Sequence, residues 1–133
     1  MLDVKLKHLD SYCANRLAAA DYYDAAFAKT DKLITPTRSS KSTHVFHQYT
    51  LKLNGVDRAG LIKYLAEKGI PAMIYYPVPL HLQKAYQDSR YKAGDFPVAE
   101  KLSECVMSLP MHTELTQEQL EYITRSVLEF LAT

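Results

Sequence analysis

The sequence predicts an α+β domain in which helices cover a small three-stranded, mainly antiparallel sheet. Three observations lead to this class. Stretches at both ends repeat apolar residues at steps of three and four, as amphipathic helices do. Short central stretches either alternate apolar with polar residues or are continuously apolar, as strands are. Gly or Pro residues separate these stretches. The chain has 133 residues, 47% of them hydrophobic. We therefore expect residues 1–133 to form a single domain with its own core.

The first element is a long amphipathic helix over residues 2–28. Its predicted apolar face consists of Leu2, Leu6, Leu9, Cys13, Leu17, Ala20, Tyr23 and Phe27. No capping residue precedes this pattern. We therefore expect the chain to be part of a longer protein, with a frayed natural N-terminus as the alternative.

A polar stretch containing Pro36, residues 29–43, predicts a loop. Residues 44–53 then alternate as a strand, so His44 and His47 are expected on opposite faces, where they cannot share a metal ion. His47 and Tyr49 are expected on the more apolar face. That position suits either a histidine satisfied within the core or one that lines a cleft.

The remaining elements follow from caps and turns. Asn54-Gly55 predicts a turn. A helix over residues 57–68 follows, capped by Asp57 and ended by Gly69, and a strand is expected over residues 71–76. Further along we expect a short helix or turn over 80–87, a helix over 97–105 that begins with Pro97, a strand over 106–109, and a helix over 117–131 that begins with a Thr116 and Gln119 capping box.

The segment from Gly69 to Gln83 is the strongest candidate for binding. Pro77 and Pro79 exclude both a ladder partner and a helix, so the backbone must leave the sheet in an extended form. Tyr75, Tyr76 and His81 are thereby presented around a stiff irregular segment, where binding groups are often found. The alternative is a tight strand exit with ordinary core aromatics.

Bulk properties exclude several function classes. Sixteen Lys and Arg residues stand against fifteen Asp and Glu residues, with the signs interspersed, and no apolar run approaches a membrane span. We therefore expect neither nucleic acid nor a membrane as partner. Cys13 and Cys105 lack metal or redox spacing, which favours a cytoplasmic location.

No complete active site is apparent from the residues. The sequence has no Gly-rich phosphate loop, paired Cys motif, H-E-x-x-H or G-x-S-x-G. The five histidines are scattered, and Glu114 is explained by the dipole of the final helix. The residues by themselves thus predict a surface lined by Tyr and His.

Several segments, in their order, resemble one family. They are H-V-F-H-Q-Y-T-L-K-L, R-A-G-L-I-K-Y-L-A-E-K-G-I, I-Y-Y-P-V-P-L-H-L-Q, G-D-F-P-V-A-E-K-L and V-M-S-L-P-M-H-T-E-L-T. They are similar to the C-terminal part of DegT/DnrJ/EryC1/StrS aminotransferases, and the opening helix also matches. The resemblance covers essentially all 133 residues.

The resemblance implies the small domain of a fold-type I, pyridoxal-phosphate-dependent aminotransferase. These enzymes aminate nucleotide-linked keto-sugars for cell-surface polysaccharide or amino-sugar biosynthesis. The implied partners are a nucleotide-sugar substrate, an amino-acid donor and a second subunit of a homodimer. In the family, three sets of groups hold the cofactor: the Schiff-base lysine, the groups that bind the cofactor phosphate, and the acidic partner of the pyridine nitrogen. They lie upstream in the large domain, and no segment here resembles them. By itself this chain is predicted to bind no cofactor and to be inactive.

Carried over residue by residue, the resemblance implies no catalytic residue in this chain and a set of substrate-binding residues. They are Tyr75, Tyr76, His81, His47 and Tyr49. Tyr75 stands where many relatives carry His, so stacking or a hydroxyl contact is expected there. His112 is interpreted as structural. The alternative function is a stand-alone, non-catalytic binding or interaction domain with the same fold.

Overall fold

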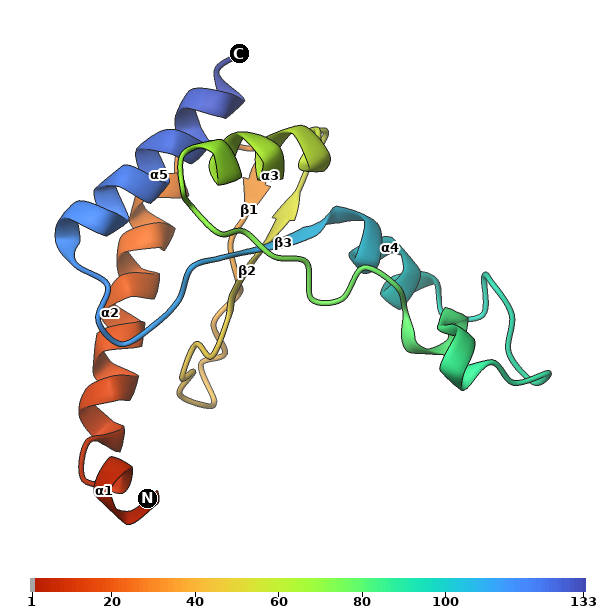
Figure 1. Ribbon diagram of the computed structural model, residues 1–133, viewed down its shortest axis with the longest axis horizontal. Coiled ribbons are helices and arrows are strands. Elements are labelled where there is room, and N and C mark those ends of the chain that lie inside the picture. Colours follow the sequence, from red (N-terminus) through yellow and green to blue (C-terminus); the bar gives the residue numbers. More distant parts are fainter. Residues whose placement is uncertain (1) are drawn as a thin grey trace.

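The computed structural model describes residues 2–133 and has the predicted α+β architecture (Figure 1). A three-stranded antiparallel sheet has α2 and α5 on one side and α4 on the other. In chain order the elements are α1 (Leu2–Leu6), α2 (Leu9–Phe27), β1 (Leu33–Ile34), β2 (Tyr49–Leu53), α3 (Arg58–Glu67), the 3-10 turns η1 (Leu80–Leu82) and η2 (Lys84–Tyr86), α4 (Pro97–Cys105), β3 (Val106–Leu109) and α5 (Gln117–Leu131).

The elements of the second half lie where the local signals predict them. α4, β3 and α5 have the predicted bounds, and α3 lies within the predicted 57–68. The Asp57 carboxylate accepts the backbone N–H of Gly60 at 3.0 Å. Gly69 ends α3 with a φ of 72°, a conformation that favours glycine. Thr116 and Gln119 form the reciprocal capping box.

The third strand of the sheet is β1, and this corrects the sequence-based prediction. β1 lies inside the predicted loop over 29–43 and pairs with β2, while β2 pairs with β3. The predicted strand over 71–76 makes only one bridge, in which Met73 and Ser108 exchange both backbone hydrogen bonds. Pro71 and Pro77 flank this bridge and lack the N–H that a longer ladder requires.

The predicted strand over 44–53 is also shorter than expected, since β2 begins at Tyr49. Phe46 has a φ of 44°, which breaks the extended backbone that the alternation assumes. As a result Phe46 is buried and Val45 exposed, whereas the predicted alternation puts Val45 on the same apolar face as Tyr49 and Phe46 on the opposite face. The alternation holds only within β2, where Tyr49, Leu51 and Leu53 face the core.

The predicted helix over 2–28 is divided into α1 and α2 by a turn at Lys7 and His8. Tyr23 and Phe27 are buried as expected, but Leu6 and Leu9 are 65% and 46% exposed. In Figure 1, α1 and the first half of α2 extend away from the sheet. The apolar repeat therefore includes leucines near the start of the chain that no other described residue buries. No helix in the described chain combines the length and apolar character needed to cross a membrane.

The core lies between the inner face of the sheet and the helices α2, α3 and α5. α5 packs against both α2 and α3. The largest fully buried side chains gather here, namely Tyr23, Tyr49, Phe27, Phe46, Leu51, Leu61, Leu65, Met107 and Val127. The opposite, outer face of the sheet carries Thr50 and Lys52, and α4 packs against β2. This face holds the candidate site.

Candidate functional site

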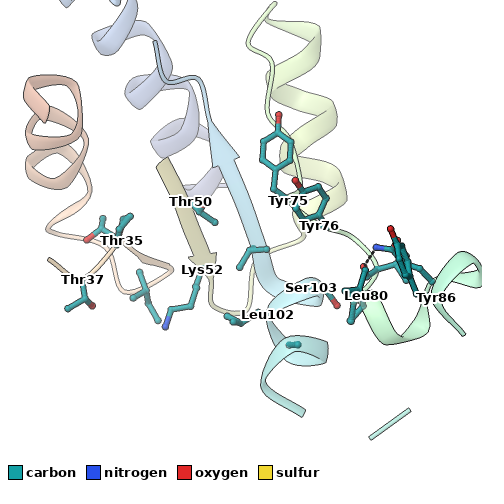
Figure 2. A pocket seen from close by; sticks show the side chains of 17 residues that line it. Thr35, Thr37, Thr50, Lys52, Tyr75, Tyr76, Leu80, Tyr86, Leu102 and Ser103 are labelled. Atoms are coloured by element: carbon teal, nitrogen blue, oxygen red, sulfur yellow. Dashed lines mark hydrogen bonds between the residues drawn. The ribbon is translucent and has the colours of Figure 1, made fainter. Parts of the chain in front are cut away.

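The outer face of the sheet forms one wall of a groove of about 770 Å³, which we call the outer groove. Figure 2 shows its polar side chains arriving from separate parts of the chain, with Thr50 and Lys52 on β2 and Ser103 on α4. The full lining consists of Ile34, Thr35, Pro36, Thr37, Thr50, Lys52, Tyr75, Tyr76, Val78, Pro79, Leu80, Gln83, Tyr86, Ala99, Leu102, Ser103 and Val106.

Tyr75 and Tyr76 form the rim of this groove on the segment that follows α3 (Figure 2). Their side chains are 39% and 70% exposed, and their rings stand edge to face with centroids 5.8 Å apart. The peptide bond between them is cis. Because both side chains are exposed, each presents a ring and a hydroxyl at the rim of the groove, as Tyr does at many binding surfaces.

A second depression of about 310 Å³, which we call the histidine hollow, shares Tyr75 with the outer groove. Both His47 and His112 line it. The remaining lining residues are Gln48, Pro71, Met73, Ser108, Leu109, Pro110 and Met111. The structure thus brings together two predicted site residues, His47 and Tyr75, that lie 28 positions apart in the sequence.

His112 also lines this hollow, although the sequence suggested only a structural role. The strand register of the structure places it there, because Tyr49 pairs with Leu109 in the antiparallel ladder. Residues that follow Leu109 must then lie beside residues that precede Tyr49. The Nδ1 atom of His112 accepts the backbone N–H of Glu114 at 3.2 Å, which fixes the direction of its ring.

A third depression of about 330 Å³ joins the two. It shares Pro36 and Thr50 with the outer groove, and His47 and Gln48 with the histidine hollow. The candidate site is therefore a continuous surface from α4, across the outer face of β2, to the histidine hollow. Among the polar side chains of the described residues that line these three depressions, hydroxyls are the most frequent groups, Lys52 is the single amine, and there is no carboxylate.

His81 lies outside these depressions. Its side chain is only 8% exposed, its Nε2 atom lies 3.0 Å from Glu100 Oε1, and its ring packs against Phe96 at 4.7 Å. Glu100 also accepts the backbone N–H groups of Gly94 and Phe96. The Gly94 bond is the main reason that the pKa of Glu100 lies below its usual value, and His81 adds to the effect. His81 thereby ties η1 to the start of α4.

Tyr49 is fully buried in the core, where its ring lies 4.8 Å from that of Tyr23. Its hydroxyl donates to Asp24 at 2.5 Å. Burial, followed by the hydrogen bond to Asp24, raises the pKa of Tyr49 above its usual value, so the hydroxyl stays a donor. In the described chain this side chain points to the inner face, away from the candidate site.

The arrangement can bind a ligand that carries both hydroxyl or phosphate groups and an apolar or aromatic part. It holds no cluster of three or more His, Cys, Asp or Glu side chains suited to a metal ion, within the part of the chain that the structure describes. Fold and site thus define a candidate binding surface on a small α+β domain.

Comparison with known proteins identifies the class to which this domain belongs. The DegT/DnrJ/EryC1/StrS aminotransferase family model matches residues 1–128, and the chain belongs to this family. It is 39% identical over 132 residues to the "Pleiotropic regulatory protein" of Geobacillus stearothermophilus, covering 98% of this chain and 35% of that protein.

Two further relatives are described by their chemistry. The chain is 38% identical over 123 residues to the UDP-N-acetyl-3-dehydro-alpha-D-glucosamine 3-aminotransferase of Acidithiobacillus ferrooxidans, covering 92% of this chain and 32% of that enzyme. The crystal structure of DesV from S. venezuelae, solved in complex with a ketimine intermediate, superposes with a TM-score of 0.93. That match has 30% identity and covers 99% of this chain and 35% of DesV. The chain spans about a third of the length of these relatives.

Proposed function

We propose that this chain is the C-terminal, substrate-side domain of a pyridoxal-phosphate-dependent aminotransferase that aminates nucleotide-linked keto-sugars. Family membership over residues 1–128 and the sugar chemistry named for relatives support the reaction class. The observation that carries the proposal is the convergence of His47 and Tyr75, from distant parts of the chain, on one open hollow beside a hydroxyl-lined groove. Cell-surface polysaccharide or amino-sugar biosynthesis would use such a product.

In this proposal Tyr75, Tyr76 and His47 contact the substrate. The two tyrosines offer ring faces and hydroxyls, and His47 adds an imidazole that can donate or accept a hydrogen bond. His81 and Tyr49 are left out, because Glu100 engages the first and the core buries the second. The domain would thus recognise the sugar nucleotide and help to close the cleft over the reacting carbon.

Pyridoxal phosphate, when bound, supplies an electron sink for the amino transfer. The residues of this chain do not fit it as a complete site. Among the described residues, Lys52 is the only amine that lines the three depressions, and no carboxylate in that lining could pair with the pyridine nitrogen. We therefore assign no step on the cofactor to this chain, and we place the cofactor groups in sequence that the relatives have beyond the matched third.

We further propose that the active protein is a cytoplasmic homodimer that uses an amino-acid donor. The exposed leucines of α1 and α2, such as Leu6 and Leu9, provide an apolar surface for packing against another domain or subunit. Stand-alone binding by the same fold is the competing function. Translation of the DNA upstream of Met1 distinguishes the two, because the proposal requires an in-frame large domain with a cofactor lysine.

The decisive experiment uses the complete open reading frame that contains this chain. Purified protein is mixed with pyridoxal phosphate, L-glutamate and a UDP- or dTDP-linked keto-sugar, and mass spectrometry follows conversion of the keto group to an amine. We expect turnover in the complete protein, at least tenfold weakened by Tyr75→Ala. Tyr122→Ala is the matched control, because Tyr122 is 38% exposed on α5, outside the candidate site.

The 133-residue chain provides a second test. We expect no reducible adduct with pyridoxal phosphate at any one lysine after borohydride treatment. A stoichiometric adduct on Lys52 would overturn the assignment of the cofactor groups to other sequence. Absence of turnover with every keto-sugar nucleotide, in a complete protein that does bind the cofactor, would overturn the proposed amination of sugar nucleotides.

A further inference from the structure

Residues 35–48, which we call the bridging loop, connect β1 with β2 and contribute to every part of the candidate site. Thr35 and Thr37 line the outer groove, and His47 and Gln48 line the histidine hollow. The shape of both depressions therefore depends on how this loop is held.

The backbone holds the bridging loop weakly. It contains no helix or strand, and no backbone hydrogen bond joins it to any other described segment. Its conformation must therefore come from side chains.

Arg38 supplies the polar part of that attachment. Its Nη1 atom donates to Asp21 at 2.5 Å and its Nη2 atom to Asp24 at 2.6 Å, both on α2. Within the described residues, these are the only side-chain hydrogen bonds that connect the bridging loop to the rest of the chain. The Arg38 side chain is 35% exposed, so part of the pair is shielded from solvent.

Arg38 also contacts the far end of the same loop. Its guanidinium carbon lies 4.9 Å from the centroid of the Phe46 ring, which is itself fully buried. Asp24, which accepts from Arg38, accepts the Tyr49 hydroxyl through its other oxygen. One arginine thus links α2, both ends of the loop and the start of β2.

We infer that Arg38 is a positioning residue that holds the bridging loop against α2, so that His47 and the two threonines face the candidate site. A planar guanidinium can reach two carboxylates and lie on a ring at the same time, whereas an ammonium is a single point charge. Lysine at this position would therefore preserve the charge but only part of the geometry. The consequence for catalysis rests on the proposed function; the ordering of the loop does not.

The first test measures loop order directly in the 133-residue chain by ¹⁵N relaxation. We expect lower order parameters for residues 39–48 in Arg38→Gln, an intermediate decrease in Arg38→Lys, and unchanged values in α3, α5 and β3. The ring signals of His47 should shift, while those of Tyr64, on α3, stay in place.

Arg90→Gln is the matched control. Arg90 also makes two bonds to a carboxylate, that of Asp88, and lies 5.5 Å from the centroid of the Tyr91 ring, but it connects only near neighbours in the sequence. We expect no change in the bridging loop from this variant. Unchanged loop order in Arg38→Gln would overturn the inference. So would a loss of order spread evenly over the whole chain in both Arg38 variants, because Arg38 would then be a general stabilising residue.

The second test measures steady-state kinetics in the complete aminotransferase. Arg38→Gln should raise KM for the keto-sugar nucleotide about tenfold, with KM for glutamate unchanged and partial recovery in Arg38→Lys. Equal effects on both KM values would contradict a substrate-side positioning role. If the wild-type protein shows no turnover, the proposed function fails, while the relaxation measurements still decide the role of Arg38.

Discussion

The two faces of the sheet differ in what their residues do. On the inner face Tyr49, Leu51 and Met107 are fully buried against α2, α3 and α5. On the outer face Thr50 and Lys52, which alternate with Tyr49 and Leu51 along β2, line the outer groove. Because successive residues of a strand point in opposite directions, one five-residue strand serves both packing and binding.

This division means that neighbouring substitutions should have separable consequences. Loss of an inner-face side chain should lower stability, because the core is closely packed. Loss of an outer-face side chain should leave the fold intact and alter only the surface offered to a ligand. The predictions below test that separation, beginning with the largest expected effect.

Leu51→Ala should cause the largest loss of stability. The side chain is fully buried, and its removal leaves a cavity, so we expect the free energy of unfolding to fall by about 2–5 kcal/mol. Lys52→Ala, one residue along, should change it by less than about 0.5 kcal/mol. Urea unfolding followed by circular dichroism measures both. Similar losses in the two variants would show that the faces are not separable.

Tyr49→Phe should have an intermediate effect, because it keeps the ring and removes the hydroxyl that donates to Asp24. We expect a loss of about 1–2 kcal/mol in the free energy of unfolding. The control is Tyr122→Phe, which removes an exposed hydroxyl that donates to the backbone carbonyl of Lys68. If Tyr122→Phe lowers the free energy of unfolding as much as Tyr49→Phe does, burial of the hydrogen bond to Asp24 adds nothing to stability.

Local signals explain how much of the fold could be predicted. α4, β3 and α5 are delimited by Pro97, Pro110 and the Thr116 capping box, all readable from neighbouring residues. β1 could not be found this way, since two residues carry no periodicity. The strand predicted over 44–53 was too long at its start, where the positive φ of Phe46 interrupts the extended backbone. That conformation accompanies burial of Phe46 in a core formed by distant elements, which local sequence does not reveal.

The candidate site was predictable to a similar degree. Tyr75 and Tyr76 are exposed because Pro77 and Pro79, which follow them, end the pairing of the chain with the sheet. Both prolines are visible in the sequence. His112 and Arg38 could not be recognised, because their neighbours are set by strand register and by the packing of α2. His81 shows the converse: a residue in a promising motif is engaged by Glu100, 19 positions away.

Glu100→Gln should make stability depend less on pH. The pKa of Glu100 is lowered in the folded state, chiefly by the Gly94 N–H. The ionised carboxylate therefore stabilises the fold at pH values above 4.5, its ordinary pKa. That contribution is lost as the pH falls below 4.5 through the folded pKa. The variant should be less stable at neutral pH and should lose less stability than the wild type as the pH falls below 4.5. Parallel wild-type and variant profiles in urea unfolding would contradict this.

Tyr76→Ala should have the smallest effect on the fold. Its side chain is 70% exposed on the outer groove and packs only at the rim, so the free energy of unfolding should change by less than about 0.5 kcal/mol. In the complete aminotransferase the same change should raise KM for the keto-sugar nucleotide about five- to tenfold, because an aromatic contact is lost. Tyr76→Phe separates the ring from the hydroxyl, and recovery of KM would assign the contact to the ring face. A loss of stability as large as that of Tyr49→Phe would instead place Tyr76 among the residues that hold the fold, and the outer face would lose its separate role.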